Sequence, residues 1–126
     1  MKLRWLSWVV VVALVGACSA DPQAGDECEQ ENSGGCESDS VALFCEDGRL
    51  RAIPCSGAGG CTENSSQFVC DFSKAKAGEA CRKANEDQVQ CDVSNANQLL
   101  RCVSGIWKAE TCKECTTQGN QLVCAL

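Results

Sequence analysis

The stretch VALFCEDGRLRAIPC, residues 41–55, decides the fold of this chain. Two apolar, β-prone runs flank Asp47-Gly48, and an Asp-Gly pair between such runs is a strong signal for a β-hairpin. The stretch NQLLRCVSGIWKAETC, residues 97–112, repeats this layout around Ser104-Gly105. Each stretch therefore predicts an antiparallel hairpin, with one cysteine on its first strand and another just after its second strand.

The two hairpins belong to two copies of one six-cysteine module. The cysteines of the copies are Cys28, Cys36, Cys45, Cys55, Cys61 and Cys70, and Cys81, Cys91, Cys102, Cys112, Cys115 and Cys124. In both copies a glycine lies three residues before the first cysteine, nine residues separate the third cysteine from the fourth, and the last segment runs from Cys-Thr to Val-Cys. These coincidences over about 46 residues indicate an internal duplication.

The duplication divides the chain into five parts. We expect an export signal, a membrane tether, a first module, a linker and a second module, at residues 1–17, 18–24, 25–71, 72–77 and 78–126. In each module a third strand is expected to follow the hairpin, at 67–70 and 121–124. The polar segment between the first two cysteines of each module is expected to be a loop. The predicted fold class is small, disulfide-rich and mainly β.

Thirteen cysteines in 126 residues are typical of a disulfide scaffold. Modules of about 50 residues have too little apolar surface to offset the entropy of ordering the chain, so bridges are expected to hold them together. We predict that all twelve module cysteines pair, in three bridges per module. Six cysteines allow 15 connectivities, and their spacing does not choose among them.

The composition excludes several kinds of site. The chain has no His, which removes Ser-His-Asp and Cys-His catalysis and His-ligated metal sites. Its formal charge of −6 argues against nucleic-acid binding. The first module carries ten acidic and two basic side chains, a net charge of −8, whereas the second carries six acidic and five basic ones. We expect no enzymatic activity, no metal and no cofactor.

The thirteenth cysteine, Cys18, follows an N-terminal export signal. Lys2 and Arg4 form a basic start, and an unbroken apolar run follows at Trp8–Val15. The apolar segment is shorter than the roughly 20 residues that a transmembrane helix needs. The sequence Val15-Gly16-Ala17-Cys18 resembles a bacterial lipobox.

This resemblance implies a lipid anchor. It implies that cleavage leaves Cys18 as the first residue, that its sulfur carries diacylglycerol, and that its amine carries a further acyl chain such as palmitate. Two or three buried acyl chains hold a protein stably at a membrane. Because Ser19 follows, and not the Asp that directs inner-membrane retention, the resemblance implies the outer membrane or cell surface. A plain secretory signal, which leaves Cys18 unmodified, is the alternative.

Trp107 is the candidate binding residue of the second module. It takes the place that Leu50 has in the first module, five residues after the matching cysteine. Trp side chains dominate binding hot spots and have an amphipathic ring, which favours an exposed anchor. The alternative is that Trp107 and Leu50 both pack over their hairpins and bridges.

Two motifs could suggest a redox or metal site, but the sequence favours a structural role for the first and does not match a calcium loop in the second. Cys112 and Cys115 form a C-x-x-C, but an exported chain without a βαβ pattern favours two half-cystines over a redox pair or a zinc site. The acidic stretch 26–31, with Glu37 and Asp39, lacks the residue order of a calcium-binding loop.

Two further motifs bear on modification and inhibition. Asn64-Ser65-Ser66 matches a glycosylation sequon, but beside a lipobox we interpret it as turn chemistry. Arg101 and Lys113 each lie next to a cysteine, which leaves a small protease inhibitor as an alternative function.

The whole mature chain resembles the tandem six-cysteine repeats of bacterial surface lipoproteins, which implies its location and build. The run from Phe44 to Asp71 is similar to the C-terminal half of peritrophin-type chitin-binding modules, although Cys61 is extra and aromatic residues are scarce. Epidermal-growth-factor-like modules share the last cysteine gap, but they have one residue between the fourth and fifth cysteines, where these copies have five and two.

We therefore expect a lipid-anchored, extracytoplasmic surface protein without enzymatic activity, whose paired modules serve interaction or envelope structure. Its partners are the membrane, through the anchor, and a protein or glycan. The first alternative is a carbohydrate-binding module that recognises chitin or peptidoglycan around Trp107.

Overall fold

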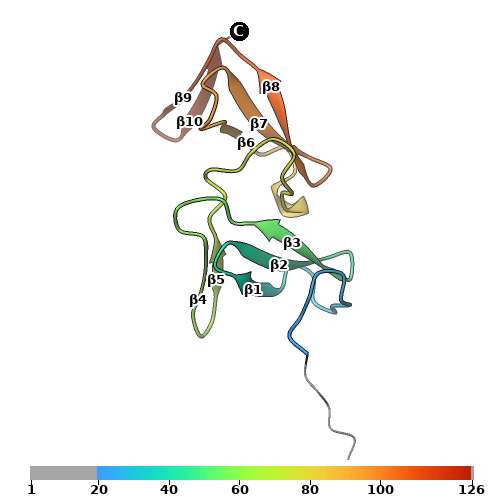
Figure 1. Ribbon diagram of the computed structural model, residues 1–126. Coiled ribbons are helices and arrows are strands. Elements are labelled where there is room, and N and C mark those ends of the chain that lie inside the picture. Colours follow the sequence, from blue (N-terminus) through green and yellow to red (C-terminus); the bar gives the residue numbers. More distant parts are fainter. Residues whose placement is uncertain (1–19, 126) are drawn as a thin grey trace, which may run out of the picture.

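A computed structural model describes residues 20–125 as two small β modules placed end to end (Figure 1). Within this part of the chain, ten short strands and one 3-10 turn, η1 (Lys83–Asn85), make up the regular structure. The predicted disulfide-rich, mainly β fold is confirmed. No helix among residues 20–125 is long and apolar enough to cross a membrane.

Each module consists of a three-stranded antiparallel sheet and a separate two-stranded hairpin. The sheets have the orders β1-β2-β3 and β6-β7-β8, and the hairpins are β4-β5 and β9-β10. The strands of module 1 (25–71) are β1 (Gly34–Ser38), β2 (Val41–Glu46), β3 (Arg49–Pro54), β4 (Cys61–Glu63) and β5 (Phe68–Cys70). The strands of module 2 (78–126) are β6 (Val89–Cys91), β7 (Gln98–Val103), β8 (Ile106–Thr111), β9 (Glu114–Gln118) and β10 (Gln121–Ala125).

The predicted central hairpins are confirmed as the β2–β3 and β7–β8 pairs. Asp47 and Ser104 have φ values of 54° and 52°, and each is followed by a glycine, Gly48 or Gly105, with a φ of 76°. Positive φ at both central residues is typical of a type I′ turn, whose twist matches that of the paired strands. Turn chemistry therefore sets the register of the β2–β3 and β7–β8 pairs.

The structure adds four strands that the sequence analysis did not predict. β1 and β6 lie in segments predicted to be loops, because backbone pairing with β2 and β7 forms them without an alternating apolar pattern. The predicted third strands exist as β5 and β10, and they pair with β4 and β9. Cys61 lies directly opposite Cys70 in one hairpin, and Cys115 lies opposite Cys124 in the other.

Equivalent hydrogen bonds hold the start of each module. The N–H of Gly25 donates to the Leu50 carbonyl at 2.7 Å, and the N–H of Gly78 donates to the Trp107 carbonyl at 2.8 Å. The two copies thus agree in backbone contacts as well as in cysteine spacing, as an internal duplication predicts.

The core of module 1 lies on one face of its sheet. Ala42, Phe44 and Ile53 are buried there against cysteine side chains. Phe72, in the segment between the modules, packs against this cluster and also against the core cluster of module 2. The segment 72–77 is therefore part of the packed structure.

Candidate functional site

Arg51 on β3 joins the two modules. Its guanidinium donates a hydrogen bond to the Glu46 carboxylate at 2.9 Å, within module 1. It also donates to the backbone carbonyls of Cys81, at 2.9 Å, and Gly105, both in module 2. The Glu46 side chain is 2% exposed, and its other oxygen accepts a hydrogen bond from the N–H of Lys83 at 2.9 Å. A buried carboxylate needs such partners, and both modules supply them.

Further contacts surround this ion pair. The Arg82 guanidinium lies 4.0 Å from the centre of the Phe44 ring, a cation–π contact, and it donates to the Asn32 side chain at 3.2 Å. The hydroxyl of Ser56 donates to the Glu79 carboxylate at 2.8 Å. These contacts fix the orientation of one module relative to the other.

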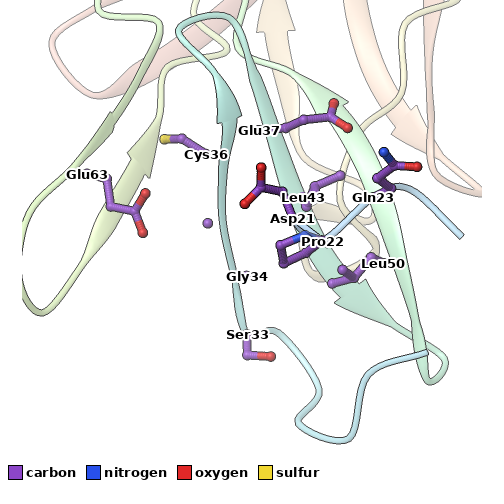
Figure 2. A pocket seen from close by; sticks show the side chains of 11 residues that line it. Asp21, Pro22, Gln23, Ser33, Gly34, Cys36, Glu37, Leu43, Leu50 and Glu63 are labelled. Atoms are coloured by element: carbon purple, nitrogen blue, oxygen red, sulfur yellow. The ribbon is translucent and has the colours of Figure 1, made fainter. Parts of the chain in front are cut away.

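A groove of about 640 Å³ opens on module 1 (Figure 2). Leu43 and Leu50 form its apolar floor. Because side chains alternate along a strand, this floor lies on the opposite sheet face from Phe44 and Arg51, which face the core and module 2. The groove and the module interface therefore use opposite faces of one sheet.

The wall of the groove is acidic. Asp21, Glu37 and Glu63 line it, and none of them takes part in the ion pairs found in residues 20–125. In the same part of the chain, no group of three or more His, Cys, Asp or Glu side chains is arranged to hold a metal ion. These three carboxylates, which have no cation partner among the described residues, give the groove a negative potential, which favours a positively charged ligand.

Two glycines of β1 shape the groove. A Cβ on Gly34 would lie 1.8 Å from the Leu43 carbonyl oxygen, and a Cβ on Gly35 would lie 3.2 Å from Glu63 Oε1. Glycine therefore lets β1 lie close to β2 and leaves no side chain between the apolar floor and Glu63. The sequence signal is Gly34-Gly35, but it falls in a segment predicted to be a loop, so the sequence analysis missed the groove.

Ten of the twelve module cysteines form five bridges. They are Cys28–Cys45, Cys36–Cys61 and Cys55–Cys70 in module 1, and Cys81–Cys102 and Cys91–Cys115 in module 2. Cys112 and Cys124 are free thiols in the structure, so the prediction that all twelve pair is confirmed for ten only. Contact with the Cys124 thiol and burial raise the pKa of Cys112 to about 11. The two residues are neighbours, in the places that Cys55 and Cys70 hold in module 1.

Trp107 is buried, with 3% of its surface exposed. It belongs to a core cluster with Ala75, Leu100 and Cys102. The expectation of an exposed anchor is wrong, because neighbouring side chains cover the ring and leave it no surface for a sugar or a partner. The alternative, in which Trp107 and Leu50 both pack over their hairpins and bridges, is confirmed for Trp107 only, because Leu50 is half-buried and lines the groove.

Two other sequence motifs are engaged within the fold. Arg101 lies on β7 and donates two hydrogen bonds to Glu110, at 2.7 and 3.2 Å, so it is not presented on a loop, whereas Lys113, the other basic residue of the inhibitor alternative, is exposed between β8 and β9. The side-chain oxygen of Asn64 accepts hydrogen bonds from the N–H groups of Ser66 and Gln67, at 3.1 and 3.0 Å. This is the turn chemistry expected at that position.

Cys18, the predicted lipidation residue, lies outside the described residues, and its modification stays a prediction. Comparison with protein-family models, with curated proteins and with solved structures finds no match.

Proposed function

We propose that this chain is a binding protein of the bacterial cell envelope, without enzymatic activity, held by a lipid on Cys18 at the outer membrane or cell surface. The observation that supports binding is the acidic groove over Leu43 and Leu50. Its volume, about 640 Å³, lies in the range of pockets that bind ligands in proteins.

The build of the molecule supports a preorganised site. Bridges hold both sheets, and Arg51 with Glu46 fixes the orientation of the modules. A rigid site loses less conformational entropy on binding than a flexible one. The strands that carry Leu43 and Leu50 are therefore held in place for a partner.

The groove also lies close to the predicted anchor. Asp21, Pro22 and Gln23 line it, and Asp21 is the third residue after Cys18. Three residues of extended chain span about 11 Å at most. A lipid on Cys18 would thus keep the groove near the membrane surface, where it would meet partners in or on the same membrane.

Fractionation of cells tests the anchor. The wild-type protein is expected in the membrane fraction and to need detergent for release, whereas Cys18→Ser is expected to lose the lipid and the membrane association. If the wild type and Cys18→Ser were distributed equally between the membrane and soluble fractions without detergent, the anchor would be contradicted.

Cross-linking in cells tests the binding role. A photo-reactive amino acid at Gln23, on the groove, is expected to give a discrete cross-linked product, and the same probe at Asn120, in the β9–β10 turn, serves as the control. Cross-linking from Asn120 as strong as from Gln23 would contradict a role for the groove.

A further inference from the structure

The groove of module 1 has a filled counterpart in module 2. The matching cysteines align Leu43 with Leu100 and Leu50 with Trp107. Leu100 is fully buried and Trp107 nearly so, in one cluster with Ala75. In module 1, Leu43 is also buried, with 4% of its surface exposed, but Leu50 is only half-buried and lines the groove, so this face is open at Leu50.

The cover in module 2 comes from two large rings. Trp107 supplies one, and Phe72, in the segment that precedes the module, packs against the cluster. Counting back from the glycine that begins each module places Pro22 at the position of Ala75. Module 1 has the smaller Leu50 in place of the Trp ring, so its face keeps a space that a large apolar side chain would fill.

Charge also distinguishes the two faces. The cysteine alignment places Lys74 and Thr117 where module 1 has Asp21 and Glu63. The acidic residues at these two positions are therefore specific to module 1, whereas Glu37 is matched by another acid, Asp92. An apolar floor beside carboxylates is complementary to an apolar side chain that has a cation next to it.

We propose that the groove binds a segment of a partner protein in which an aromatic or large aliphatic side chain is flanked by lysine or arginine. The apolar side chain would lie on Leu50, beside the buried Leu43, in the place that the Trp107 ring takes in module 2. The cationic groups would pair with Asp21, Glu37 and Glu63. This inference rests on the proposed binding function and names the chemistry of its partner.

Three labelled peptides test the proposal on the detergent-solubilised full chain by fluorescence anisotropy. The probe Gly-Lys-Phe-Lys-Gly is expected to bind at least tenfold more tightly than Gly-Glu-Phe-Glu-Gly and Gly-Lys-Ala-Lys-Gly. Its affinity is expected to fall as salt is raised, because salt screens exposed charges.

Two kinds of variant separate the apolar contact from the charges. Leu50→Trp places in the groove the ring that module 2 already holds at this position, and it is expected to weaken binding at least tenfold while the chain stays folded. Glu37→Gln with Glu63→Gln leaves the cavity open and is expected to weaken binding similarly. Glu29→Gln with Asp39→Asn changes the charge by the same amount away from the groove and serves as the control.

The outcomes are distinct. Equal affinity of the wild type and the Leu50→Trp variant, or equal affinity for the Phe and Ala peptides, would overturn the apolar contact. An equal loss in the control double variant would overturn specific pairing with the groove carboxylates. If the wild type binds none of the peptides at millimolar concentration while Gln23 still cross-links in cells, the partner chemistry is wrong and the proposed function stands.

Discussion

The buried carboxylate of Glu46 and the part-buried guanidinium of Arg51 form an ion pair at 2.9 Å, and the same guanidinium reaches across to the backbone of module 2. The pair lies next to the hairpin turn of module 1. The Arg51 side chain therefore pairs with the buried charge of Glu46 in module 1 and also hydrogen-bonds to the backbone of module 2. This relationship makes the two copies a single unit.

Removal of Arg51 should uncouple the modules. Arg51→Met leaves the Glu46 carboxylate buried without its cation, and the free energy of unfolding is expected to fall by about 3–5 kcal/mol. Urea unfolding with the bridges intact measures this. Arg101→Met, which removes a more exposed ion pair, is the control and should have little effect. A loss no larger than that of the control would contradict the structural role of Arg51.

Trp107 should report a buried environment. It is the only Trp that remains after residues 1–17 are removed, so fluorescence of the mature chain comes from this ring. We expect blue-shifted emission that acrylamide quenches weakly. Trp107→Ala should reduce the free energy of unfolding by about 3–5 kcal/mol, because it opens a cavity in the core of module 2. Strong quenching in the folded protein would contradict the burial of this ring.

Cys112 and Cys124 should pair with each other on oxidation, because they occupy the places of the Cys55–Cys70 bridge. Oxidised glutathione would take up two electrons and two protons from the two thiols, giving one protein disulfide and two molecules of reduced glutathione. Thiol titration after unfolding should then show the loss of two thiols, and peptide mapping should find the 112–124 link. A link from either cysteine to a different one would contradict the equivalence of the modules.

With Cys112 and Cys124 reduced, the stability of the protein and the reactivity of Cys112 should depend on pH. The pKa of Cys112 is raised to about 11 by the Cys124 thiol and by burial, so the folded protein keeps a proton that an unfolded thiol loses near pH 9. The protonated Cys112 thiol therefore contributes to the free energy of unfolding in full below pH 9. This contribution is lost as the pH rises from 9 towards 11. Alkylation of Cys112 by iodoacetamide should be slow at neutral pH and should speed up over this range, because the thiolate is the reactive form.

A matched variant tests the cause of this pH dependence. Cys124→Ser removes the neighbouring thiol, and the rise in Cys112 alkylation should move to lower pH. An unchanged profile would show that Cys124 does not influence the Cys112 thiol.

Local chemistry made much of the fold predictable. Asp47-Gly48 and Ser104-Gly105 specify tight turns through their backbone preferences, and they predicted both central hairpins without knowledge of the rest of the chain. Cysteine spacing showed the duplication in the same way. β1 was missed, since the pairing of Gly34-Gly35 with β2 is a backbone contact that leaves no side-chain pattern.

The sequence by itself determined that this is a disulfide-held β protein of two copies, because turn preferences and repeat spacing are properties of neighbouring residues. Only the tertiary structure decided which cysteines meet, that Trp107 is buried while the matching face over Leu50 stays open, and that Arg51 crosses to module 2. Those features depend on which faces of separate strands come together. The two copies share a backbone plan, but the side chains that reach each sheet face differ, and so one copy has a closed face and the other has a groove.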